Sequence, residues 1–123
     1  MEKIKLEFSA TSSLFPKNSI VVVMTLDEKG KNYKAKFENE LIGKQKELPP
    51  LPTRVLAAFT ENAINKILAK DEIPNESGIM VLDGNSYEIT ITKGGTKKEY
   101  YADDASIETY SLLRYLASWC RRL

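Results

Sequence analysis

The side chains of this sequence best suited to chemistry are two adjacent carboxylates, Asp103 and Asp104, with Glu99 shortly before them. Carboxylates alone can hold Mg²⁺, so this group would suit a metal-assisted, nuclease-like enzyme. Two aspartates just before a helix also place negative charge at the positive end of the helix dipole. We therefore predict no metal site and no cofactor, and we keep the carboxylate-dependent enzyme centred on Asp103 and Asp104 as the alternative hypothesis.

Most other kinds of catalysis lack their usual residues in this sequence. It contains no histidine, which removes the common general base, the Ser-His and Cys-His pairs, and zinc sites built from several His or Cys ligands. The single cysteine, Cys120, is expected on the last turn of an apolar helix, where a thiol usually behaves as a small hydrophobic group. The glycine and serine patterns of phosphate-binding loops, dinucleotide-binding folds and hydrolases are also missing. We predict that the protein is not an enzyme.

The charges of the chain nearly cancel, with 18 Lys and Arg against 17 Asp and Glu. Without a large net charge, phosphate neutralisation alone does not hold nucleic acid or an anionic membrane. The longest apolar run, Ile20–Met24, is far too short to cross a bilayer, and the first residues lack the apolar stretch of a secretory signal. A single cysteine fits a reducing compartment. We expect a cytoplasmic protein with neither a membrane nor a nucleic-acid partner.

Two apolar segments are candidates for contact with another protein. Residues 9–17 form a connection too long for a tight hairpin, and such a loop either packs back on the core or presents its central Leu14 and Phe15 to a partner. The final helix carries more apolar surface than one sheet contact uses, and its second stripe contains Leu112, Tyr115 and Trp119. That stripe packs against the first helix, which we favour, or forms a homodimer or partner interface. The predicted partner-binding residues are Leu14, Phe15, Leu112, Tyr115 and Trp119.

The segment Lys46–Arg54 contains the pattern Pro49-x-x-Pro52, which fits both orientations of an SH3 ligand. A proline-rich segment adopts the polyproline II conformation before it binds, which lowers the entropic cost of docking into an aromatic groove. The same prolines would equally make the extended connector that a strand-to-helix transition needs. Both interpretations remain open at this point.

The elements that must position these residues follow from the spacing of apolar side chains. Period-two alternation predicts strands over Ile4–Phe8 and Tyr33–Phe37. Between them, the nearly continuous β-branched run Ile20–Met24 predicts a strand buried on both faces near the middle of the sheet. After Thr53, a possible N-cap, apolar residues recur at three- and four-residue steps and predict a helix to about Lys70. The first half of the chain therefore has the order βββα.

The second half is expected to repeat this order. A short strand at Ile79–Leu82 precedes a hairpin of Tyr87–Thr92 and Lys97–Ala102, and Ser106 caps a final helix to about Arg122. Too few identities align to make the halves a sequence repeat. We predict one α+β domain over residues 1–123: a mainly antiparallel sheet of five to six strands with two helices packed on it, in the order βββα-βββα.

The stretch 82–105, LDGNSYEITITKGGTKKEYYADDA, followed by Leu112–Leu116, resembles the closing hairpin and helix of small bacterial α+β domains, among them the emfourin-type protease inhibitors. The resemblance covers about the last 40 residues and specifies a fold element rather than an active site. It implies a small, inhibitor-like role. The first half, with its LPPLP connector and longer helix, departs from the emfourin pattern, so no inhibitory residue is transferred.

These observations give one leading hypothesis. We expect a non-enzymatic protein-interaction module that acts as an inhibitor, immunity or modulator protein by binding another protein. The alternative is the metal-assisted enzyme described above, and a homodimer through the C-terminal helix is a third possibility.

Overall fold

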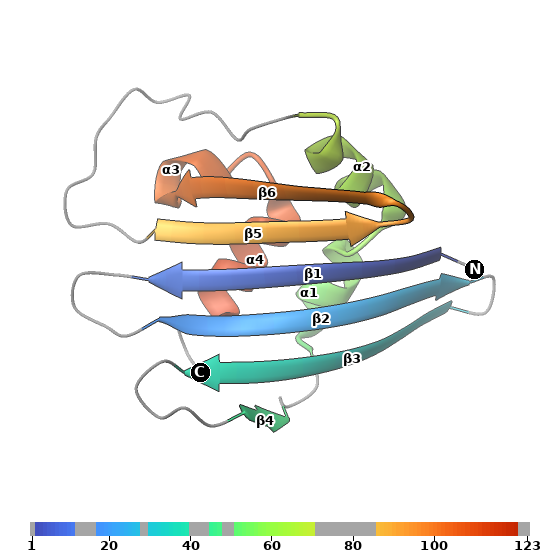
Figure 1. Ribbon diagram of the computed structural model, residues 1–123, viewed down its shortest axis with the longest axis horizontal. Helices are drawn as coiled ribbons and strands as arrows, with labels where there is room; N and C mark the ends of the chain where they lie inside the picture. The colour runs from blue at the N-terminus through green and yellow to red at the C-terminus, as the bar shows by residue number, and fades with distance from the viewer. Residues whose placement is uncertain are drawn as a thin grey trace.

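The computed structural model describes residues 2–11, 17–27, 30–39, 45–47, 51–70 and 86–120. Its strands form one antiparallel sheet in the order β4-β3-β2-β1-β5-β6 (Figure 1). The strands are β1 (Glu2–Thr11), β2 (Asn18–Asp27), β3 (Gly30–Asn39), β4 (Gln45–Glu47), β5 (Ser86–Lys93) and β6 (Thr96–Asp103). The helices are α1 (Thr53–Ala58), α2 (Glu61–Leu68), α3 (Asp104–Ile107) and α4 (Ser111–Cys120).

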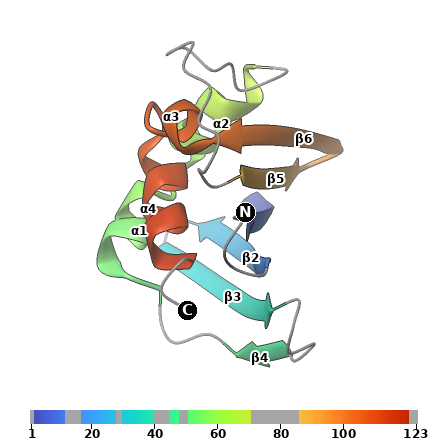
Figure 2. The ribbon, with the colours of Figure 1, turned by 90° about the vertical axis from the view of Figure 1, so that its left-hand side faces the viewer.

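All four of these helices lie on one side of the sheet, as the view in Figure 2 shows. The predicted α+β class with an antiparallel sheet is therefore confirmed. The predicted order βββα-βββα stays a prediction, because the expected strand Ile79–Leu82 lies outside the described residues. The three-residue strand β4 was not predicted. Within the described part of the chain, no helix has the length and apolar character needed to cross a membrane.

The centre of the sheet is β1, which pairs with β2 on one side and with β5 on the other. Leu6 lies opposite Val22 and Ile91, and Phe8 lies opposite Ile20 and Ile89. All of these side chains are at most 1% exposed. Because side chains alternate between the two faces of a strand, this register joins the apolar sides of three strands into one surface.

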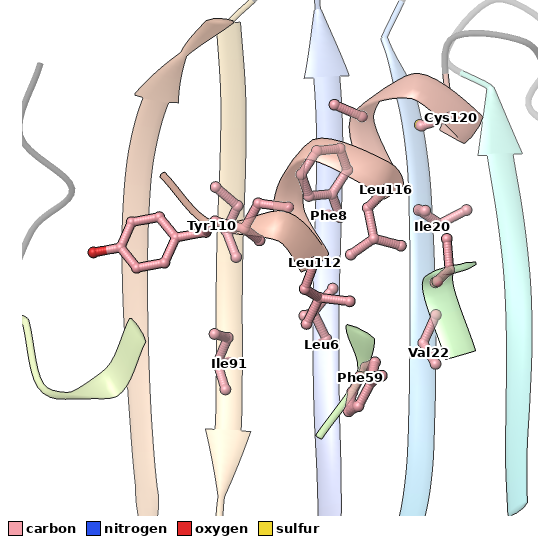
Figure 3. Close-up of a cluster of buried hydrophobic side chains, with 14 of the residues drawn as sticks. Leu6, Phe8, Ile20, Val22, Phe59, Ile91, Tyr110, Leu112, Leu116 and Cys120 are labelled. Atoms are coloured by element: carbon pink, nitrogen blue, oxygen red, sulfur yellow. The ribbon is translucent and has the colours of Figure 1, made fainter. Parts of the chain in front are cut away.

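Helix α4 lies across this apolar surface (Figure 3). Leu112, Leu116 and Cys120 are at most 1% exposed and belong to the same cluster as Phe8 and the apolar side chains of β2. The amide nitrogen Nδ2 of Asn18 donates a hydrogen bond of 3.2 Å to the carbonyl oxygen of Cys120. The end of α4 is thereby held at the start of β2.

Lysines on the helix side of the sheet bond to the helices that cover it. The ammonium group of Lys98 donates to the carbonyl of Leu68, at the end of α2, over 2.8 Å, and Lys31 donates to the carbonyl of Leu56 in α1. Lys93 donates to Asn65 Oδ1 over 2.6 Å. A helix leaves its last carbonyls without intrahelical partners, so cations there are favourable. These lysines contribute to the attachment of the helix layer.

The predicted helix from Thr53 to Lys70 is two helices, because the chain leaves helical geometry at Phe59 and Thr60. Thr60 is extended, with φ −119° and ψ 161°, and its hydroxyl accepts a hydrogen bond of 3.0 Å from the backbone nitrogen of Ala63. A threonine hydroxyl that takes a backbone donor in this way starts a new helix. Thr53 is the first helical residue rather than the N-cap, a position that Pro52 occupies.

The predicted helix from Ser106 to Arg122 is also divided, into α3 and α4. Its N-cap is Asp103 rather than Ser106. The Oδ1 atom of Asp103 accepts hydrogen bonds of 2.8 Å from both the backbone nitrogen and the hydroxyl of Ser106. Ser106 therefore acts as the donor in this cap.

We expect Thr60→Ala to lower the free energy of unfolding by about 1 kcal/mol, because the cap of α2 loses its acceptor. Thr60→Ser keeps a hydroxyl at the same position and should stay within about 0.5 kcal/mol of the original chain. Urea unfolding followed by circular dichroism measures both. Equal losses in the two variants would contradict a capping role for the hydroxyl.

Candidate functional site

The face of the sheet that points away from the helices is not covered by any described helix or strand, and Figure 1 is viewed from this side. We call it the open face. It consists of the side chains of β1, β2, β3, β5 and β6 that alternate with the core residues. The register arranges them in rows across the strands, of which two carry most of the charge. In order from β6 to β3 these are Lys97, Thr92, Lys5, Val23 and Lys34, and then Glu99, Thr90, Glu7, Val21 and Lys36.

Two pairs of β-branched side chains flank β1 in the middle of the open face. Val21 and Val23 on β2, with Thr90 and Thr92 on β5, are half-buried. The charged residues Lys5, Lys34 and Glu99 are more exposed. On β1, Lys5 and Glu7 lie between these two pairs, so the middle of the face presents β-branched and charged side chains together.

Tyr101 on β6 lies at one end of this face and is 71% exposed, an unusual position for so large an aromatic side chain. Beside it is a shallow hollow of about 360 Å³, with Ser86, Glu88 and Asp103 among its lining residues. Glu88 also pairs with Lys17, with 3.4 Å between Nζ and Oε2. An exposed tyrosine next to an acidic hollow is suited to contact with a basic side chain of a partner.

The predicted binding residues of the C-terminal helix lie on the opposite side of the molecule from the open face. Leu112 is 1% exposed and belongs to the core. Tyr115 is half-buried beneath two guanidinium groups, those of Arg54 at 5.8 Å and Arg114 at 5.2 Å from the ring centre. Trp119 is half-buried against the core cluster. Because α1 contacts α4, this part of the second apolar stripe packs within the helix layer.

The other sequence-predicted features are placed only in part. Leu14 and Phe15 lie outside the described residues, as does Pro49. Leu51 is 4% exposed, and its backbone nitrogen donates a 2.9 Å hydrogen bond to the hydroxyl of Tyr33. The described end of the proline segment is thus anchored to β3, as a structural connector would be.

The described residues offer little for catalysis or metal binding. No group of three or more His, Cys, Asp or Glu residues that could hold a metal is found among them. The carboxylate of Asp103 accepts the cap bonds from Ser106, and the side chain of Asp104 is outside the described part. The thiol of Cys120 is buried, with its sulfur 3.7 Å from the carbonyl oxygen of Asn18. Among the described residues, the open face is an extended surface with exposed charged side chains.

Sequence reasoning missed the open face as a site. The alternation of each strand was visible, but the rows exist only once the strands are paired in register. Comparisons of the chain with protein-family models, with curated proteins and with solved structures gave no match. The geometry of the open face is therefore the main guide to function.

We expect Leu112→Ala to lower the free energy of unfolding by about 2–5 kcal/mol, because it leaves a cavity between α4 and the sheet. Tyr101→Ala, which removes a larger but exposed side chain, should change it by no more than about 0.5 kcal/mol. Chemical unfolding of the two variants provides the comparison. A large loss for Tyr101→Ala would mean that its ring is part of the core.

We expect Asp103→Ala to lower the melting temperature, since the α3 cap typically contributes about 1 kcal/mol. The protein and this variant should show no shift specific to Mg²⁺ or Mn²⁺ in a thermal-shift titration. A metal-specific stabilisation that Asp103→Ala abolishes would instead favour the carboxylate-dependent enzyme.

Proposed function

We propose that this chain is a non-enzymatic protein-interaction module, and that it binds another protein through the open face of its sheet. The observation that carries the proposal is this broad accessible face, on which half-buried β-branched side chains flank the charged residues of β1 and Tyr101 is exposed. Rigid sheets present such side chains without ordering a loop, which lowers the entropic cost of binding. The role that we propose is that of an inhibitor, immunity or modulator protein.

Two further observations support a binding role over a catalytic one. The sequence has no histidine, and the described carboxylate of the candidate metal pair, Asp103, serves as a helix cap. The resemblance of β5, β6 and α4 to the closing hairpin and helix of emfourin-type inhibitors is in keeping with an inhibitor-like role. A chain with one cysteine has no need of an oxidising compartment, and we propose the cytoplasm as its location.

A matched pair of substitutions tests the proposed surface. Glu99→Lys reverses an exposed charge on the open face. Glu108→Lys makes the same change at the exposed C-cap of α3, in the helix layer on the other side of the sheet. We expect Glu99→Lys to weaken the binding of a partner about tenfold, whereas Glu108→Lys leaves it unchanged. Affinity capture from the native cell identifies the partner, and titration calorimetry with the purified partner then measures both variants.

The partner's own activity completes this test. A stoichiometric amount of the original chain should inhibit or alter that activity, and Glu99→Lys should do so only at higher concentration. Equal weakening by both substitutions would remove the open face from the proposal. A partner that is chemically converted by the chain would contradict the non-enzymatic role itself.

A further inference from the structure

The charges of the open face are separated along the strands. At the end of the sheet where β1 begins, the face carries four exposed lysines, which we call the basic half: Lys3, Lys5, Lys34 and Lys97. Towards the other end it carries four glutamates and one lysine, Lys36, and we call this the acidic half; the glutamates are Glu7, Glu38, Glu88 and Glu99. The two rows that meet in the middle are those of Lys5 and Glu7, whose charged atoms are 3.8 Å apart.

This separation makes the face complementary to itself. Consider a twofold axis that lies in the plane of the open face and runs across the strands. Rotation by 180° about this axis places the open face of a second copy against the open face of the first. If the axis passes between the rows of Lys5 and Glu7, the basic half of each copy meets the acidic half of its partner. The same patch then serves on both copies, as a twofold interface requires. On β1 and β6, Lys5 and Lys97 approach Glu7 and Glu99 of the second copy.

The half-buried β-branched side chains of the open face lie close to this axis. Val21 and Val23 on β2, with Thr90 and Thr92 on β5, belong to the two rows on either side of the axis. Val23 would meet Val21 of the second copy, and Thr92 would meet Thr90, on either side of the charged residues of β1.

The strand β3 differs from the other strands of the face. Its two central rows carry Lys34 and Lys36. Two lysines in successive rows do not complement each other across the axis, so β3 belongs at the margin of the contact, where water screens the charges.

The size of the face is also adequate. Five strands of eight to ten residues cover roughly 24 by 30 Å, or about 700 Å², from the usual strand spacing and rise. A standard stable interface buries about 800 Å² on each partner. Two sheets of this kind pack face to face at an angle of about 30° without distortion. The whole face is therefore comparable to one partner's share of a stable dimer.

We propose that a second copy of this chain docks face to face on the open face, related by a twofold axis that crosses the strands between Lys5 and Glu7. A uniformly acidic or basic partner would match only one half of the face, whereas a second copy matches both. The formal net charge of +1 leaves little long-range repulsion between two copies. The homodimer keeps the face covered until another protein displaces the second copy. The inference shares its surface with the proposed function but does not depend on it.

Charge-reversed variants give a direct test. An acidic variant carries Lys5→Glu and Lys97→Glu, and a basic variant carries Glu7→Lys and Glu99→Lys. In light scattering after size exclusion, the original chain should be a dimer at about 100 μM, with affinity falling as salt screens the contact. Each variant alone should be a monomer, since like charges then face each other across the axis. An equimolar mixture should form a one-to-one dimer of the two variants.

The outcomes that overturn the inference are equally definite. The inference is wrong if the original chain is monomeric at about 100 μM in low salt. It is also wrong if the mixture stays monomeric although both variants show the original circular dichroism spectrum. A dimer that survives both sets of reversals but is lost with Trp119→Ala would assign the interface to α4 instead. A monomeric chain that still captures a partner overturns this inference alone. A dimer that captures none overturns only the proposed function.

Discussion

The pairing of β1 with two neighbours at once determines much of this architecture. Its residues Leu6 and Phe8 are buried only because β2 and β5 are both in register with it, which aligns the apolar sides of the three strands. A shift of one residue in either pairing would turn an entire strand over and place charged side chains against the helices. The register that buries the apolar side chains beneath the helices therefore also determines which charged side chains are neighbours on the open face.

The two faces of the sheet use lysine in different ways. Lys31, Lys93 and Lys98 are on the helix side, where their ammonium groups reach polar atoms of α1 and α2. Lys5 and Lys34, on the opposite face, are exposed. Lys31 and Lys34 are close together in the sequence of β3. Because side chains alternate along a strand, they lie on opposite faces of the sheet. The nearly neutral composition therefore does not reveal that the charges of the open face are separated into two halves.

Much of the fold could be predicted from the sequence, because period-two and helical spacing are local properties. Five of the expected strands and both helical regions are found close to their predicted places. The breaks at Thr60 and after α3 were missed, since a cap is recognised by its hydrogen bond rather than by apolar spacing. The candidate site was harder to predict. Its rows combine residues from distant strands, and whether Leu112 is core or interface depends on how closely α1 approaches α4.

The position of β1 in the middle of the sheet affects the state of the chain while it is being synthesised. This strand leaves the ribosome before its neighbour β5, which begins only at Ser86. At about 5–20 residues per second, roughly 4–15 s pass before β5 follows. During this interval one edge of β1 has no native neighbour, although Ile4, Leu6 and Phe8 already alternate as in the finished sheet. Unpaired edges of this kind recruit foreign strands. The strand at the centre of the finished sheet is thus open to such pairing until β5 is made.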